Sequence, residues 1–250
     1  MIGESVRRDV GNPMVDLNGR VAVVTGGSEG IGRAIAAALA REGASVMLTS
    51  RSRERAEATA RELDGEHPGT VRGWPCDVRD MAQCEALIEA TLDAFGALHI
   101  LVNNAGVGIF KPIQEMTVEE YRVQVDTNLN GVFHCTKAAL DALREAEDAW
   151  VLNVGSLASR NSFGRGVGYN ASKFGLLGMT EAMMLDLRYE GIRTAILMPG
   201  SVNTDFSDHG DRAWAIQPED LGETILQLLS YPRHTLVSRV EVRPSMPPRS

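Results

Sequence analysis

The chain has 250 residues, of which 44% are hydrophobic and 23% charged, as in ordinary soluble globular proteins. Its 33 acidic and 25 basic residues give a net charge of −8, which excludes a general attraction to nucleic acid or to anionic membranes. The three cysteines have no metal-ligand spacing and are odd in number, so we expect free thiols in a cytoplasmic protein and no metal site. No apolar run approaches the ~18 residues that span a membrane.

The domain organisation is expected to be simple, because the chain shows no internal repeat and no interdomain linker. Residues 1–16 contain glycine, asparagine and proline without the apolar core of a secretory signal, and we expect a flexible lead-in there. Residues 17–244 are expected to form one α/β domain, a class that often reaches this size. A proline-rich tail without regular structure is expected over residues 245–250.

The first elements predict a dinucleotide-binding unit. Residues 21–25 form a short apolar run, typical of a strand that is buried on both faces in a parallel sheet. Residues 26–32 read Gly-Gly-Ser-Glu-Gly-Ile-Gly and lead into a helical pattern that ends at Gly43. Glycines let the backbone approach a pyrophosphate closely, and the helix N-terminus offers free N–H groups to it. A strand, a glycine-rich turn and a helix in this order favour dinucleotide binding.

The end of the second strand, residues 46–49, bears on the choice between NAD(H) and NADP(H). An acidic residue at this place accepts from a ribose 2′-hydroxyl, whereas an arginine accommodates a 2′-phosphate. The chain has Ser50, Arg51 and Arg53 here and no carboxylate, which favours NADP(H). Glu29 in the glycine-rich turn opposes this choice because its charge would repel a 2′-phosphate, so NAD(H) stays open.

Later strands end in segments that suit the wall of a ligand crevice. Strands are expected over residues 71–74, 98–102, 150–154, 192–198 and 236–242, and helices over 53–63, 81–95, 117–133, 169–187 and 218–229. Together with the first two strands they predict a single Rossmann-type doubly wound domain, with a seven-stranded parallel sheet in the order 3-2-1-4-5-6-7. Ligands bind at the carboxyl ends of such strands. A short substrate lid is expected over residues 205–217.

Tyr169 and Lys173 are the chemically most suggestive pair. On a helix they stand four residues apart and so share a face. A phenol normally ionises near pH 10, and a neighbouring ammonium group would lower that pKa toward the range useful for acid–base catalysis. Ser156, at the end of a predicted strand, could hold a carbonyl oxygen within reach of the phenol.

The motifs taken together resemble those of the short-chain dehydrogenase/reductase family, in its single-domain branch. The glycine motif has the spacing T-G-x-x-x-G-I-G over residues 25–32, and residues 104–106 read N-A-G. Tyr169 and Lys173 form Y-x-x-x-K, and residues 199–204 match P-G-x-V-x-T. The resemblance covers residues 18–242.

The resemblance implies a role for individual residues. Asn128, Ser156, Tyr169 and Lys173 are the catalytic candidates, with Asn128 distorting its helix and holding a water on a proton path to Lys173. The substrate-binding candidates are Ser156, Phe163 and Tyr169, together with Phe206 and Trp214. The last two come from the expected lid itself, where their rings could contact a substrate or pack the lid onto the body. The cofactor-binding candidates are Gly26, Ser28, Glu29, Gly30, Ile31, Ser50, Arg51, Asp77, Val78, Asn104, Ala105, Gly106, Tyr169, Lys173, Pro199, Gly200, Val202 and Thr204.

The function that this resemblance implies is hydride transfer between NADP(H) and a ketone or aldehyde and its alcohol, as in a carbonyl reductase. A small-molecule substrate and a homodimer or homotetramer are the expected partners. The alternatives are an NAD-dependent alcohol dehydrogenase and a 3-oxoacyl-carrier-protein reductase, whose acidic carrier Arg160 and Arg165 would meet. A non-catalytic dinucleotide-binding regulator is the alternative outside enzymes, although all four catalytic candidates are present.

Overall fold

The computed structural model describes residues 15–204, 206 and 212–247. Most of the expected lead-in, part of the expected lid and the last three residues of the tail lie outside the described residues. The strands are β1 (Val21–Val24), β2 (Ser45–Ser50), β3 (Val71–Pro75), β4 (Ile100–Asn103), β5 (Ala149–Val154), β6 (Ile192–Pro199) and β7 (Arg239–Val242). The α-helices are α1 (Gly30–Arg41), α2 (Arg53–Asp64), α3 (Met81–Phe95), α4 (Val118–Val125), α5 (Gly131–Glu145), α6 (Val167–Leu187) and α7 (Pro218–Leu229).

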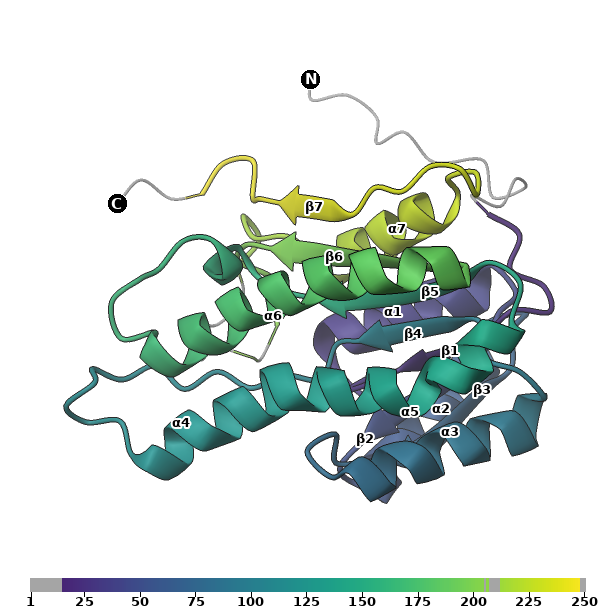
Figure 1. Cartoon of the computed structure of the whole chain (residues 1–250), viewed down its shortest axis with the longest axis horizontal. Helices are drawn as coiled ribbons and strands as arrows, with labels where there is room; N and C mark the ends of the chain where they lie inside the picture. The colour runs from purple at the N-terminus through teal and green to yellow at the C-terminus, as the bar shows by residue number, and fades with distance from the viewer. Residues whose placement is uncertain (1–14, 205, 207–211, 248–250) are drawn as a thin grey trace.

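The strands form one seven-stranded parallel sheet in the order β3-β2-β1-β4-β5-β6-β7, which confirms the predicted fold and strand order. Helices α3, α4, α5 and α6 lie in front of the sheet in Figure 1, and α1, α2 and α7 lie behind it. The order reverses direction between β1 and β4, where the carboxyl ends of neighbouring strands leave a crevice. The fold therefore places the segments after the strands along one edge.

The core consists of two apolar layers, one on each face of the sheet. Successive side chains of a strand point to opposite faces, so in β1 Ala22 and Val24 pack with Leu39 of α1, whereas Val23 packs with Leu87 of α3. All residues of β1 are buried, as the continuous apolar run predicts. Among the described helices none is long and apolar enough to cross a membrane.

Several elements differ from those expected, beyond shifts of one or two residues at the strand ends. The helix predicted over residues 117–133 is interrupted by a π-helical turn at Asp126–Asn130, which separates α4 from α5. Between the strand expected over residues 150–154 and the helix expected from residue 169, the chain forms a short 3₁₀ turn at Leu157–Ser159, and α6 already begins at Val167. The last strand covers only Arg239–Val242, because the residues before it form a turn and an extended segment.

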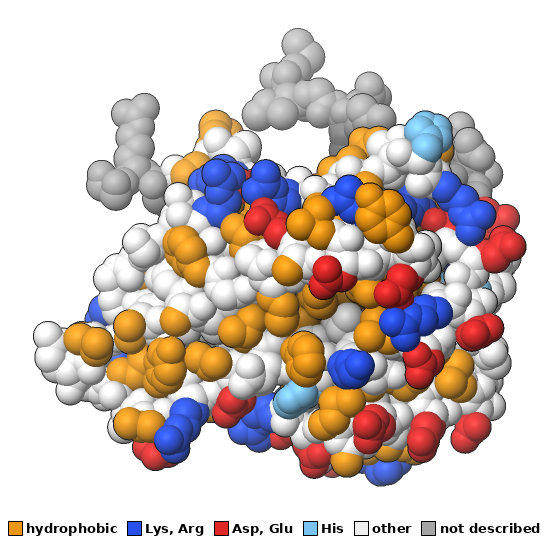
Figure 2. All heavy atoms as spheres, in the orientation of Figure 1, with side chains coloured by type: hydrophobic (Ala, Val, Ile, Leu, Met, Phe, Trp, Pro, Cys, Tyr) orange, Lys and Arg blue, Asp and Glu red, His pale blue; other side chains and the backbone are white. Residues whose placement is uncertain are grey.

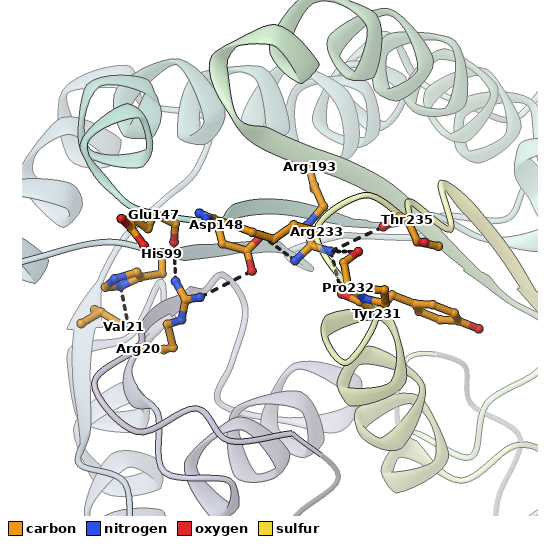
Figure 3. Close-up of polar contacts among 10 residues, drawn as sticks. All are labelled: Arg20, Val21, His99, Glu147, Asp148, Arg193, Tyr231, Pro232, Arg233 and Thr235. Carbon is orange, nitrogen blue, oxygen red and sulfur yellow. Dashed lines mark hydrogen bonds and ion pairs between the residues drawn. The ribbon is translucent and has the colours of Figure 1, made fainter.

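The amino ends of the strands are closed by a cluster of charged residues (Figure 3). Arg193 at the start of β6 donates to a carboxylate oxygen of Asp148 at 2.6 Å and to main-chain carbonyls of the segment before β7. Arg20 and Arg233 lie 3.5 and 3.8 Å from the same carboxylate. The Arg193 guanidinium also lies over the ring of Trp150, 3.9 Å from its centroid. This cluster joins β1, β5, β6 and the segment before β7 at the edge opposite the crevice.

Candidate active site

A cavity with a volume of about 1730 Å³ lies at the carboxyl ends of the strands. Its lining comes from the segments that follow the seven strands and from the first turns of α6. This volume exceeds the ~300–1,000 Å³ of pockets that take one drug-sized molecule. It therefore has room for a dinucleotide together with a substrate.

The glycine-rich turn leaves a cradle in which side chains have no space. Gly26 has φ +62°, and a Cβ on Gly32 would lie 2.2 Å from the Gly26 carbonyl oxygen. The side-chain amide of Asn104 donates to the carbonyls of Thr25 and Gly26 at 2.9 and 3.1 Å. These bonds tie the segment after β4 to the turn before α1, whose N-terminal N–H groups lie at the cavity. The donor set and the free space fit a pyrophosphate group.

Three arginines line the end of the cavity beyond β2. Arg55 lies 3.5 Å from the carboxylate of Glu29, and Arg79 binds the carboxylate of Asp77. That pairing lowers the pKa of Asp77, chiefly through the hydrogen bonds that Arg79 donates. Arg51 forms no ion pair with another described residue. The Glu29 carboxylate thus has a cation beside it, and the guanidinium of Arg51 remains available to an anion.

Asn128 lies in the π-helical turn and is completely buried. Its amide oxygen accepts from the Val107 N–H at 2.8 Å, and its amide nitrogen donates to the Val107 carbonyl and to the Ser172 hydroxyl at 2.8 and 3.0 Å. Asn128 does not line the cavity. Its side chain instead holds the segment after β4 against α6.

Tyr169, Lys173 and Ser156 meet inside the cavity. Tyr169 and Lys173 come from the first turns of α6, and Ser156 follows β5. The Lys173 ammonium donates to the Val154 carbonyl at 2.8 Å and lies 5.8 Å from the centroid of the Tyr169 ring. Gly106 faces this group, because a Cβ there would lie 3.9 Å from the Lys173 nitrogen. The atom nearest to that Cβ would be the amide oxygen of Asn128, at 3.3 Å, so a larger residue at position 106 would first press on Asn128.

The electrostatics of the pair differ from those that the sequence pattern predicts. Burial lowers the pKa of Lys173 to about 8, because a buried ammonium group loses its hydration. Burial also raises the pKa of Tyr169, and a hydrogen bond from Ser156 acts in the opposite direction without cancelling this effect. The phenol of Tyr169 is thus a weaker acid than a phenol in water, contrary to the expected lowering of its pKa.

The cofactor candidates named from the sequence all line the cavity, as do Ser156, Phe163 and Phe206. Trp214 does not line it and is half-buried elsewhere in the segment before α7. The sequence reasoning missed Phe110 and Arg55, which both line the cavity. Arg55 lies in the first turn of α2, four residues after Arg51, and this nearness in sequence could have indicated it. Phe110 had no comparable signal.

The chain matches the family model of short chain dehydrogenases over residues 20–213. An uncharacterised oxidoreductase of Staphylococcus saprophyticus is 32% identical over 92% of this chain and its own entire length. The D-threitol dehydrogenase of Mycolicibacterium smegmatis is 36% identical over 79% of this chain and 75% of its own.

Two solved structures are similar over nearly the whole chain. An alcohol dehydrogenase from the archaeon Thermococcus sibiricus, complexed with 5-hydroxy-NADP, has a TM-score of 0.85 and 32% identity and covers 92% of this chain and 99% of its own. A metagenomic short-chain oxidoreductase in complex with NADP has a TM-score of 0.82 and 34% identity, with coverages of 93% and 100%. The chain belongs to the short-chain dehydrogenase family and is an oxidoreductase of that family.

Proposed function

We propose that the protein transfers a hydride between NADP(H) and a ketone or aldehyde and its alcohol, in the manner of a carbonyl reductase. The observation that carries the proposal is the meeting of Tyr169, Lys173 and Ser156 in one cavity with the glycine cradle. A phenol, a hydroxyl donor and a cation at one site match the needs of a reaction that creates an alkoxide. The named relatives include an alcohol dehydrogenase and a polyol dehydrogenase, which supports this class of reaction.

The roles of the residues follow from their positions. Ser156 donates a hydrogen bond to the substrate oxygen, and Tyr169 gives that oxygen its proton in the direction of reduction. Lys173, fixed by the Val154 carbonyl, presents its ammonium group to the phenol and to ribose hydroxyls. Asn128 is a positioning residue that fixes the strand segment beside Lys173. The nicotinamide dinucleotide, when bound, supplies or accepts the hydride.

We further propose NADP(H) as the preferred cofactor, with NAD(H) as the alternative. The guanidinium of Arg51 lines the cavity beyond β2, where a 2′-phosphate is accommodated in such folds. Glu29, which opposes this choice from the sequence, lies beside Arg55 at 3.5 Å, and the ion pair reduces its repulsion of an anion. The complexes of the two similar structures contain NADP compounds.

The carrier-protein reductase alternative gains no support from the geometry. Arg160 is ion-paired with Glu241 at 2.8 Å, and Arg165 donates to the Phe110 carbonyl at 3.4 Å. Both arginines are thus engaged within the chain. A homodimer or homotetramer and a cytoplasmic location complete the proposal; three free, buried cysteines favour a reducing compartment.

The test is a panel of ketones, aldehydes and alcohols assayed with NADPH and NADH, or with their oxidised forms. We expect turnover of at least one carbonyl–alcohol pair, with kcat/KM for NADPH about tenfold or more above that for NADH. Binding of both dinucleotides without turnover of any member would contradict the enzymatic proposal and favour a regulator. Equal use of NADH would contradict only the cofactor preference.

A further inference from the structure

The phenol of Tyr169 is surrounded by phenyl rings. The ring of Phe110 lies edge-on to that of Tyr169, with centroids 5.4 Å apart, and the rings of Phe163 and Phe206 lie at 6.5 and 6.1 Å. Phe110 and Phe163 also contact one another at 5.8 Å. All three phenylalanines line the cavity. We call Phe110, Phe163 and Phe206 the phenyl wall.

The backbone is shaped to hold the phenyl wall. A Cβ on Gly108 would lie 2.8 Å from the rings of Phe110 and Phe206, and a Cβ on Gly166 would lie 2.7 Å from the ring of Phe163. The two glycines therefore provide the space into which the rings turn. A bridge between Lys111 and Gly166 also joins the two loops that carry Phe110 and Phe163.

The side chain of Asn170 fixes the loop of Phe163 by hydrogen bonds. Its amide oxygen accepts from the Phe163 N–H at 3.3 Å, and its amide nitrogen donates to the carbonyls of Ala158 and Asn161 at 2.9 and 3.2 Å. Asn170 is itself buried and stands next to Tyr169 on α6. The wall and the phenol are thus positioned by the same helix.

The exposure of the wall indicates what it binds. Phe163 and Phe206 are 46% and 47% exposed, so about half of each side chain remains in contact with water. An apolar group placed against them would remove that surface from water and would gain stacking contacts. A polyol would instead bring hydroxyl groups against rings that offer no hydrogen-bond partner, which weakens binding.

We propose that the substrate carries an aryl group, or a similarly bulky apolar group, on the carbonyl carbon, and that the phenyl wall selects it. This inference rests on the proposed carbonyl–alcohol chemistry at Tyr169. The inferred specificity differs from that of the relative D-threitol dehydrogenase, whose name indicates a polyol substrate. Phe110, the ring nearest to Tyr169, is the principal specificity-determining residue.

The first experiment compares three substrates in reduction by the wild-type protein: acetophenone, 2-butanone and erythrulose. We expect kcat/KM for acetophenone to exceed those for the other two about tenfold or more. Turnover of erythrulose or 2-butanone at an equal or higher kcat/KM would overturn the inference and leave the proposed function standing. Absence of turnover with these ketones and with the wider panel of carbonyls and alcohols would overturn both.

The second experiment removes the ring of Phe110 from the phenyl wall. Phe110→Ala should lower kcat/KM for acetophenone about tenfold and change that for 2-butanone less than threefold, whereas Phe110→Leu should retain most of the acetophenone activity. The matched control is Phe133→Ala, because Phe133 is 53% exposed on α5 and lies outside the cavity. An equal loss with both ketones would show that Phe110 only supports Tyr169, and would overturn its specificity role.

A binding measurement separates recognition from turnover. Calorimetric titration of Tyr169→Phe with acetophenone and 2-butanone should give a Kd for acetophenone about tenfold lower, because the phenyl wall remains intact in this variant. Adding Phe110→Ala should bring the two dissociation constants within about threefold. Equal dissociation constants before that second substitution would contradict the inference.

Discussion

Buried charges are paired differently at the two ends of the strands, which we call the amino edge and the carboxyl edge of the sheet. At the amino edge, Arg193 is 91% buried as a residue and is matched by the carboxylate of Asp148 at 2.6 Å. At the carboxyl edge, Lys173 is as deeply buried, yet its one hydrogen bond among the described residues goes to a neutral carbonyl. Arg193 lies at the start of β6, whereas Lys173 reaches the other end of the strands from helix α6.

We infer from the difference that the amino edge serves stability and the carboxyl edge serves chemistry. A buried charge without an opposite partner costs free energy that the rest of the fold must supply, and such sites are typical of catalysis. A paired cluster that joins several strands instead holds the sheet together. Substitutions at the carboxyl edge should therefore reduce activity at little cost in stability, and substitutions at the amino edge should do the reverse.

The largest expected effect is that of Tyr169→Phe on turnover. Loss of the proton donor should lower kcat about 10³-fold, equivalent to about 4 kcal/mol. The free energy of unfolding should change by less than about 1 kcal/mol, because the ring and its contacts with the phenylalanines remain. Steady-state kinetics and urea unfolding on the same preparation measure both. A variant that keeps more than a tenth of the wild-type kcat would contradict the role of Tyr169.

The corresponding change at the amino edge is Arg193→Met. Removal of the guanidinium leaves the carboxylate of Asp148 with only the longer contacts to Arg20 and Arg233. We expect the free energy of unfolding to fall by about 3 kcal/mol, while kcat stays within about twofold, as urea unfolding and kinetics would show. Adding Asp148→Asn should restore part of the stability, since the carboxylate that lost its short ion pair is then removed. Unchanged stability in the single variant would mean that the cluster does not hold the sheet.

Lys173→Met tests the cost of the buried ammonium group through pH. The pKa of Lys173 is about 8 in the folded protein against 10.5 for a free lysine, so keeping the charge at neutral pH costs roughly 3 kcal/mol. Between pH 8 and 10.5 the unfolded chain holds more protons than the folded one, and wild-type stability should rise with pH. Methionine removes this cost and also the hydrogen bond to the Val154 carbonyl, worth about 1 kcal/mol.

The variant should therefore be more stable than the wild type by about 2 kcal/mol at pH 7, and this advantage should vanish by about pH 10 as Lys173 loses its charge in the wild type. Urea unfolding at several pH values gives the two curves. Lys137→Met, at a lysine of α5 outside the cavity, is the control and should leave the pH dependence unchanged. Curves that stay parallel for Lys173→Met would contradict the lowered pKa.

Much of the fold and of the cavity could be predicted because the signals are local in sequence. Continuous apolar runs indicated buried strands, and the segments directly after them had to meet at one edge of a parallel sheet. The glycines at positions 26 and 32 carried information for the same reason, since their spacing reflects a close approach within one turn. These inferences needed no knowledge of distant contacts.

The features that were missed arise from contacts between distant segments. Phe110 contacts Tyr169 because an isolated β-bridge joins Lys111 to Gly166. No local sequence pattern predicts this β-bridge. The pKa of Tyr169 was expected to fall because Lys173 is near in sequence. Burial instead raises the pKa of Tyr169, and the extent of burial depends on how the surrounding loops pack. Sequence spacing gives proximity along a helix, but it gives no measure of solvation.

The smallest predicted effect is that of Arg51→Ala on cofactor preference. Arg51 and Arg53 both follow β2, but only Arg51 lines the cavity. Arg53 instead lies over the ring of Trp74 and pairs with Glu57. Arg51→Ala should raise the KM for NADPH about tenfold, equivalent to about 1.4 kcal/mol, and leave the KM for NADH within about twofold. Arg53→Ala, the matched control, should change neither, because its exposed ion pair contributes little. Equal effects of Arg51→Ala on both cofactors would favour NAD(H) and would show that this arginine does not bind a 2′-phosphate.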